Sequence, residues 1–232
     1  MSATVAYLRG HWQLLTLTAL IFMLWATPVV LPLKLLVVFF HELAHGVAAI
    51  ATGGEIVSLS VDFREGGEVW TRGGSRFVTL TAGYLGSLVV GASLLLAALR
   101  GTADRLILGA LGALMLVVLL LYVRDLPAVV IVAATGIALL AAARFFAQPV
   151  CDLILRVIGL SSLIYVPYDI FDDTLRRAHL RSDARMLAEE IGGTTMLWGV
   201  LWLGISLCVI WLCLRHALRT TSNIELTFGR TR

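Results

Sequence analysis

The stretch LKLLVVFFHELAHGVAAIAT, residues 33–52, decides the fold, because it joins a run of apolar residues to ionisable side chains at its centre. His41 and His45 stand four residues apart, so on a helix they share one face and both imidazoles reach the same metal ion. Glu42 lies beside them, close enough to take a proton from a water molecule at that ion. Because ionisable groups in an apolar helix are costly without a partner, the pattern predicts a metal site.

The two histidines lie deep in this predicted helix. His41 follows Lys34 by seven residues, and His45 precedes Gly53 by eight. At about 1.5 Å per residue, both are roughly 10–12 Å from either helix end, well inside a hydrocarbon core of about 30 Å. A catalytic zinc ion takes three protein ligands and keeps one position for water. We therefore expect one zinc ion per chain, with a third ligand from elsewhere in the sequence.

The composition is that of a membrane protein. Of the 232 residues, 59% are hydrophobic and 14% are charged, whereas soluble domains average about 25% charged residues. A membrane-spanning helix needs about 20 apolar residues, so several fit into this chain. The sequence predicts an all-α, multi-pass integral membrane protein with six or seven transmembrane helices, seven being preferred. The apolar segments are 12–31, 35–51, 77–99, 105–123, 126–147, 153–168 and 194–214.

Charge and cysteine content argue against other classes of protein. The formal net charge is only +3, and the arginines are scattered through short connections, so no nucleic-acid partner is expected. Cys151, Cys208 and Cys213 form no CxxC pair and no even set, which argues against a disulfide scaffold and against a cysteine zinc site. The expected surroundings are the lipid bilayer.

A short β-hairpin is expected at the membrane surface in residues 55–72. Apolar and polar residues alternate through 55–64, as in a strand with one buried face. A turn follows at 65–67, and EVWTR at 68–72 is the predicted return strand. A strand edge near the metal can hold an extended peptide, so the hairpin is a candidate substrate site. The candidate contacts are Val57, Leu59 and Val61.

The best candidate for the third metal ligand lies in YDIFDD, residues 168–173. Asp169 follows a long apolar run, and its depth of about 10 Å from the nearer helix end matches that of His41. Asp172 and Asp173 each have an arginine four residues on, which gives them an ordinary salt-bridge role. Asp169 has no such arginine, and Asp173 one turn away repels it, so a nearby cation would stabilise it. Asp169 is therefore favoured, with Asp172 and Asp173 as alternatives.

Three sequence elements in this order resemble the site-2 protease superfamily, and most closely its M50B-like branch. They are HELAHG at 41–46, TAGYLGS at 81–87, and YDIFDDTLRR with the following RSDA at 168–184. The resemblance extends from about Val37 to the last predicted span. It implies a single integral membrane domain, 1–232, whose catalytic core is formed by residues 34–99 and 153–180.

The resemblance also implies a set of site residues. In this superfamily, zinc is bound by the two histidines of HExxH and by the aspartate of a later LDG motif, which corresponds here to His41, His45 and Asp169. Ile170 stands where that motif has glycine, so Asp172 and Asp173 stay open as alternatives. The second core span of the superfamily carries small residues near the site. The matching positions are Gly83, Gly86 and Ser87.

The implied activity is that of an intramembrane zinc endopeptidase in regulated intramembrane proteolysis. Glu42 would act as the general base and return the proton to the leaving amine. The substrate would be a transmembrane or membrane-associated protein that unwinds locally, because a helix hides its amides. Regulation would come from partners or from earlier trimming of the substrate.

Two other functions are compatible with the same motif. A membrane zinc hydrolase acting on a lipid or a small molecule would use the same water chemistry. A non-catalytic scaffold or transporter would hold the metal for structural reasons alone. Glu42 argues against the second alternative, because a structural metal site has no need of a base at that position.

Overall fold

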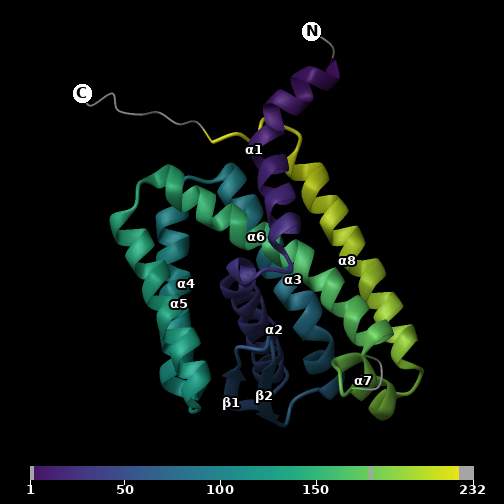
Figure 1. The fold of residues 1–232 in the computed structure, drawn as a ribbon. Coiled ribbons are helices and arrows are strands. Elements are labelled where there is room, and N and C mark those ends of the chain that lie inside the picture. Colours follow the sequence, from purple (N-terminus) through teal and green to yellow (C-terminus); the bar gives the residue numbers. More distant parts are fainter. Residues whose placement is uncertain (1–2, 178–179, 225–232) are drawn as a thin grey trace.

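The computed structural model describes residues 3–177 and 180–224, which are helical apart from connecting turns and one β-hairpin (Figure 1). A 3-10 turn, η1 (Pro28–Val30), precedes the second helix, and a π-helix, η2 (Asp172–Arg176), continues the sixth. The predicted all-α fold with a small hairpin is confirmed. The helices are α1 (Ala3–Leu24), α2 (Leu31–Ala51), α3 (Arg76–Arg100), α4 (Asp104–Tyr122), α5 (Leu126–Phe145), α6 (Gln148–Phe171), α7 (Asp183–Ile191) and α8 (Thr195–Ala217).

Six helical segments within the described residues are long and apolar enough to cross a membrane. They are α2 with the turn before it, α3, α4, α5, α6 with the π-helix after it, and α8. The sequence predicted a further span over 12–31, but α1 is not among the six. Its first half carries Arg9, His11 and Gln13, which lower its hydropathy. The described part of the chain therefore supports six spans rather than the preferred seven.

α2 carries the HELAHG sequence and is fixed at both ends. Pro32 stands in its first turn, where the missing N–H costs nothing. At the other end, the hydroxyl of Thr52 donates to the carbonyl of Ala48 at 2.8 Å, and Gly53 turns the chain with a φ of 88°. The middle of the helix is buried, with Phe39 at 0% exposure. The histidines that follow are therefore held inside the protein.

α3 and α6 cross closely because each presents a glycine to the other. A Cβ on Gly91 would collide with Ser162, and a Cβ on Gly159 would lie 2.8 Å from the backbone nitrogen of Leu95. Small residues let membrane helices approach each other in this way. α2 packs against both helices, so the three form one bundle (Figure 1).

The predicted hairpin is present, with β1 (Glu55–Val61) paired antiparallel to β2 (Gly67–Arg72). Asp62 closes the turn: its N–H donates to the carbonyl of Gly66 at 2.8 Å, and its carboxylate accepts from the N–H of Gly66 at 3.1 Å. Both strands pack on α2, and β1 also contacts α4 and α5. The outer edge of β2 therefore faces the other way, toward α7 (Figure 1).

The polar stretch of residues 174–193 contains α7. Ser182 caps the first turn by accepting from the N–H of Arg185 at 3.4 Å. Ala184 and Leu187 are fully buried and attach α7 to the bundle, where it contacts α3 and α8. α7 and the hairpin lie at the same end of the bundle (Figure 1).

Candidate metal centre

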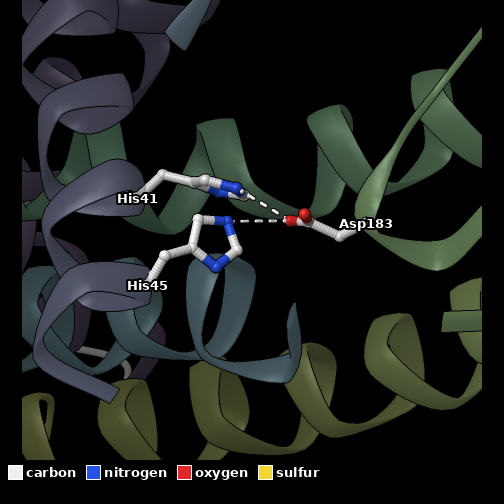
Figure 2. A group of neighbouring side chains, drawn as sticks. All are labelled: His41, His45 and Asp183. Atoms are coloured by element: carbon white, nitrogen blue, oxygen red, sulfur yellow. Dashed lines mark hydrogen bonds and ion pairs between the residues drawn. The ribbon is translucent and has the colours of Figure 1, made fainter. Parts of the chain in front are cut away.

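Three side chains converge on one point between α2 and α7 (Figure 2). The carboxylate Oδ2 of Asp183 lies 3.0 Å from Nε2 of His41 and 3.1 Å from Nε2 of His45. The three ligand atoms lie within 4.8 Å of one another, and no second group of this kind exists among the residues that the structure describes. Two imidazole nitrogens and one carboxylate oxygen are a donor set that catalytic zinc takes in proteins.

The three groups come from distant parts of the sequence. His41 and His45 lie one turn apart on α2, with ring centroids 4.7 Å apart. Asp183 is the first residue of α7, and the Ser182 cap fixes where that helix begins. Leu187, one turn further along α7, is fully buried. Its packing fixes α7 and therefore the position of the Asp183 carboxylate.

α3 orients the two imidazoles. Nδ1 of His45 lies 2.6 Å from the backbone carbonyl oxygen of Thr79, and His41 packs edge-on against Tyr84 with centroids 4.8 Å apart. Since a carbonyl oxygen only accepts, Nδ1 of His45 carries a proton. For Nε2 to face the Asp183 carboxylate at 3.1 Å, either a second proton or a metal cation must stand between them.

The electrostatic surroundings of Asp183 favour its ionised form. Burial alone would raise the pKa of this carboxyl group. The charge of His45 and the hydrogen bonds from both histidines outweigh burial and hold the pKa of Asp183 well below its usual range. A carboxylate that stays ionised is what a metal ligand must be.

Gly83 on α3 leaves space beside the three groups. A Cβ built on this residue would lie 2.5 Å from Nε2 of His41 and equally close to Nε2 of His45. The space therefore lies where the two ligand nitrogens converge, and a side chain at Gly83 would fill it. Both the donor set and this space fit a zinc ion held by the two histidines and Asp183.

Glu42 faces a cavity that the three groups also line. The cavity measures about 740 Å³ and is bordered by α2, α3, α6, α7 and the hairpin. Glu42 is 7% exposed, and within the described residues no hydrogen bond or ion pair occupies its carboxylate. β2 passes directly over it, since a Cβ on Gly67 would collide with its Oε1. This carboxylate is placed to accept a proton at the histidine pair.

The three aspartates predicted as ligands all form ion pairs with Arg177. α6 ends at Phe171 and continues as the π-helix η2. Both predicted pairs four residues apart form there, with Asp172 3.6 Å from Arg176 and Asp173 2.9 Å from Arg177. Nitrogens of the Arg177 guanidinium lie 3.7 Å from Asp169, 2.7 Å from Asp172 and 2.9 Å from Asp173. Asp169 therefore has an arginine partner, although none stands four residues after it. Asp169 also lines the cavity that Glu42 faces.

Asp183, which the structure places beside both histidines, was not among the ligands predicted from spacing. It is 142 residues from His41 and lies beyond the predicted core segment 153–180, so no helical period connects it to the histidines. One signal was present: RSDA at 181–184 puts a Ser-Asp pair before an amphipathic run, which is typical of a helix N-terminus. The geometry favours Asp183 over the three predicted aspartates.

The hairpin residues predicted to contact a substrate do not line the cavity. Leu59 and Val61 are buried in the core at 1% and 0% exposure, and Val57 lies exposed at a bulge in β1. The strand residues that line the cavity are instead 67–71 of β2 and Ser60 of β1. The alternating pattern located both strands, but it could not tell which of their residues border the site, because that depends on how the helices pack.

The three small residues predicted near the site have different surroundings. Gly83 borders the histidines, as described above. A Cβ on Gly86 would lie 2.5 Å from the Cβ of Ala44, so Gly86 sets the spacing between α3 and α2. Ser87 is buried, and its hydroxyl donates to the carbonyl of Gly83 at 2.8 Å within α3. Gly86 and Ser87 therefore serve helix packing.

Comparison with known proteins gives one match. A family model described as Peptidase M50B-like matches residues 14–213, which include the histidine pair, the hairpin, α7 and most of α8. No curated protein and no solved structure matches the chain. The family match agrees with the resemblance to the site-2 protease superfamily and with six apolar helices. The chain therefore belongs to the Peptidase M50B-like family, as an integral, multi-pass membrane protein.

Proposed function

We propose that the protein is an intramembrane zinc endopeptidase that hydrolyses peptide bonds of membrane-embedded proteins in regulated intramembrane proteolysis. The observation that carries the proposal is the convergence of His41, His45 and Asp183 beside Glu42, at a helix apolar enough to span a membrane. Membership of a metallopeptidase family supports the same chemistry.

We assign His41, His45 and Asp183 as the residues that hold one zinc ion per chain. When bound there, zinc supplies the Lewis acidity that polarises a peptide carbonyl and lowers the pKa of water. Glu42 accepts the proton of the attacking water and delivers it to the leaving amine. Thr79 keeps the His45 ring oriented through the bond to Nδ1.

The outer edge of β2 supports a peptide substrate. Asp62 and Gly66 form a hydrogen-bonded pair at the turn, and the direction of these bonds alternates along an antiparallel ladder. The backbone groups of Gly67 and Val69 therefore point to the outer edge, and both residues line the cavity. An extended segment added to this edge would pass over Glu42. A lipid substrate has no backbone donors or acceptors to match it.

Asp183→Ala is expected to lower zinc affinity by more than about 100-fold, because removing groups that only support metal ligands already costs about 10–100-fold. Asp169→Ala is the matched control, since it removes a carboxylate from the same cavity that Arg177 holds at 3.7 Å. Metal analysis of the purified variants, with chelator titration, measures the effect. Loss of zinc in Asp169→Ala together with retention in Asp183→Ala would return the ligand assignment to Asp169.

The endopeptidase activity is tested by labelling new amino termini in membranes of cells that express the protein. Wild type is expected to create termini within transmembrane segments of other proteins, and Asp183→Ala is expected to create none. Release of fatty acids by wild type without any new amino termini would instead favour the lipid hydrolase.

Val69→Pro is expected to lower cleavage up to about tenfold and to leave zinc content unchanged. Proline removes one N–H from the outer edge of β2 but no bond of the ladder, and one net hydrogen bond contributes about 0.5–1.5 kcal/mol. Val69→Ala is the control, because it keeps the N–H while shortening the side chain. Equal cleavage by Val69→Pro and wild type, measured through the same amino termini, would rule out strand addition at this edge.

A further inference from the structure

The turn of the hairpin is tied to α2 by an ion pair. Nζ of Lys34 lies 3.0 Å from Oε1 of Glu65, and the same ammonium group lies 5.0 Å from the ring centroid of Trp25. The side chains are 13% exposed for Lys34 and 35% exposed for Glu65. The pair is therefore partly shielded from water, and removing one partner leaves a poorly solvated charge.

The backbone of Glu65 has an unusual conformation that contacts with neighbouring residues maintain. Glu65 has a φ of 65°, and within the described residues it is the one non-glycine residue with positive φ. Residues other than glycine rarely adopt this left-handed region of backbone conformation. Such a conformation persists where neighbouring contacts maintain it, and the bond to Lys34 is a contact of this kind.

The ion pair stands at the start of a line of contacts that leads to Glu42. Lys34, Val38 and Glu42 follow one another at intervals of four residues along α2, so they form one ridge. The hairpin runs along this ridge. Glu65 contacts Lys34, and Gly67 lies so close to Val38 and Glu42 that a Cβ would collide with both. β2 begins at Gly67, two residues after the ion pair.

We propose that Lys34 and Glu65 are positioning residues that set the distance of β2 from Glu42 and thereby place the substrate for hydrolysis. The proposal rests on the proposed addition of the substrate to β2. Because Lys34 and Glu42 belong to one helix, the ion pair holds the substrate-bearing strand and the catalytic base in the same frame. The ion pair involves none of the three groups assigned to the metal, so its loss affects substrate placement and not metal binding.

Hydrogen exchange of the full-length protein in detergent tests this role without any substrate. In Lys34→Met and Glu65→Gln, the hydrogen-bonded amides among residues 66–72 are expected to exchange faster than in wild type, because the turn is released from α2. The double variant is expected to match the faster single variant, since both changes remove the same contact. Lys34→Arg keeps the charge and is expected to restore the wild-type exchange.

Arg72→Gln is the matched control for exchange. It breaks the Arg72–Glu55 pair, 3.2 Å long, at the other end of the hairpin, where both side chains are exposed, and such pairs contribute little. Wild-type exchange in both Lys34→Met and Glu65→Gln would overturn the proposal. Equally fast exchange in Arg72→Gln would overturn it too, because any hairpin ion pair would then have the same effect.

The kinetic consequence is measured with casein, an unfolded protein that offers extended segments. In Lys34→Met and Glu65→Gln, KM for casein is expected to rise about 3- to 10-fold, the effect of losing one partly shielded charge pair, while zinc content and kcat stay near wild type. If Val69→Pro raises KM and these variants do not, the positioning role is wrong. If Val69→Pro has no effect either, strand addition itself fails.

Discussion

Glu42→Gln is expected to keep zinc and to lower the rate of peptide hydrolysis by about 10²- to 10⁴-fold, the usual contribution of general-base catalysis. Glutamine has nearly the size of glutamate, so it still fits beneath β2, where Gly67 lies against this side chain. Its amide cannot accept the proton of the attacking water. His41, His45 and Asp183 are unchanged, so the three groups proposed to hold the metal stay in place.

Zinc content and hydrolysis are measured on the same preparations of this variant. Glu68→Gln is the matched control, because Glu68 also lines the cavity but is exposed. An uncleaved membrane protein is expected to accumulate with Glu42→Gln, and its identification would name a substrate. Cleavage at the wild-type rate would remove the proposed mechanism and favour a structural metal site.

The features that depend on local pattern were predictable from the sequence. The helix that carries His41 and His45 follows from its apolar run, and the spacing of the two histidines places them on one face. The hairpin follows from alternation and from its glycine turn, and the structure confirms both strands. The predicted span that is absent from the six is the first, because the polar side chains of α1 interrupt an otherwise apolar segment.

The features that depend on how distant segments pack were not predictable in the same way. Asp169 was favoured because no arginine stands four residues after it, but Arg177, from further along the chain, lies 3.7 Å from it. Asp183 reaches the histidines only because α7 packs its buried side chains against the bundle. The same reason explains why the cavity is lined by residues 67–71 of β2 and by Ser60 of β1, and not by the predicted Val57, Leu59 and Val61.

A glycine next to the metal centre gives the second large expected effect. Gly83→Ala is expected to lower zinc affinity by at least about tenfold, the lower end of the effect of disturbing groups around a metal. The added Cβ would lie 2.5 Å from Nε2 of His41 and of His45, so it would occupy the space where the ligand atoms converge. α3 cannot simply move away, because Gly91 already packs it tightly against α6.

Two other glycines separate this effect from a general disturbance of packing. A Cβ on Gly86, one turn further along α3, would lie 2.5 Å from the Cβ of Ala44 but touch no metal-binding group, whereas a Cβ on Gly204 would meet nothing within 4 Å. We expect Gly86→Ala to lower the thermal stability and keep zinc, and Gly204→Ala to change neither. Zinc content and thermal unfolding of the purified variants check this order. If Gly83→Ala binds zinc as tightly as wild type, the ion does not lie between the two Nε2 atoms. If Gly86→Ala loses as much zinc as Gly83→Ala, the separation of α2 and α3 controls metal binding, and not the space at Gly83.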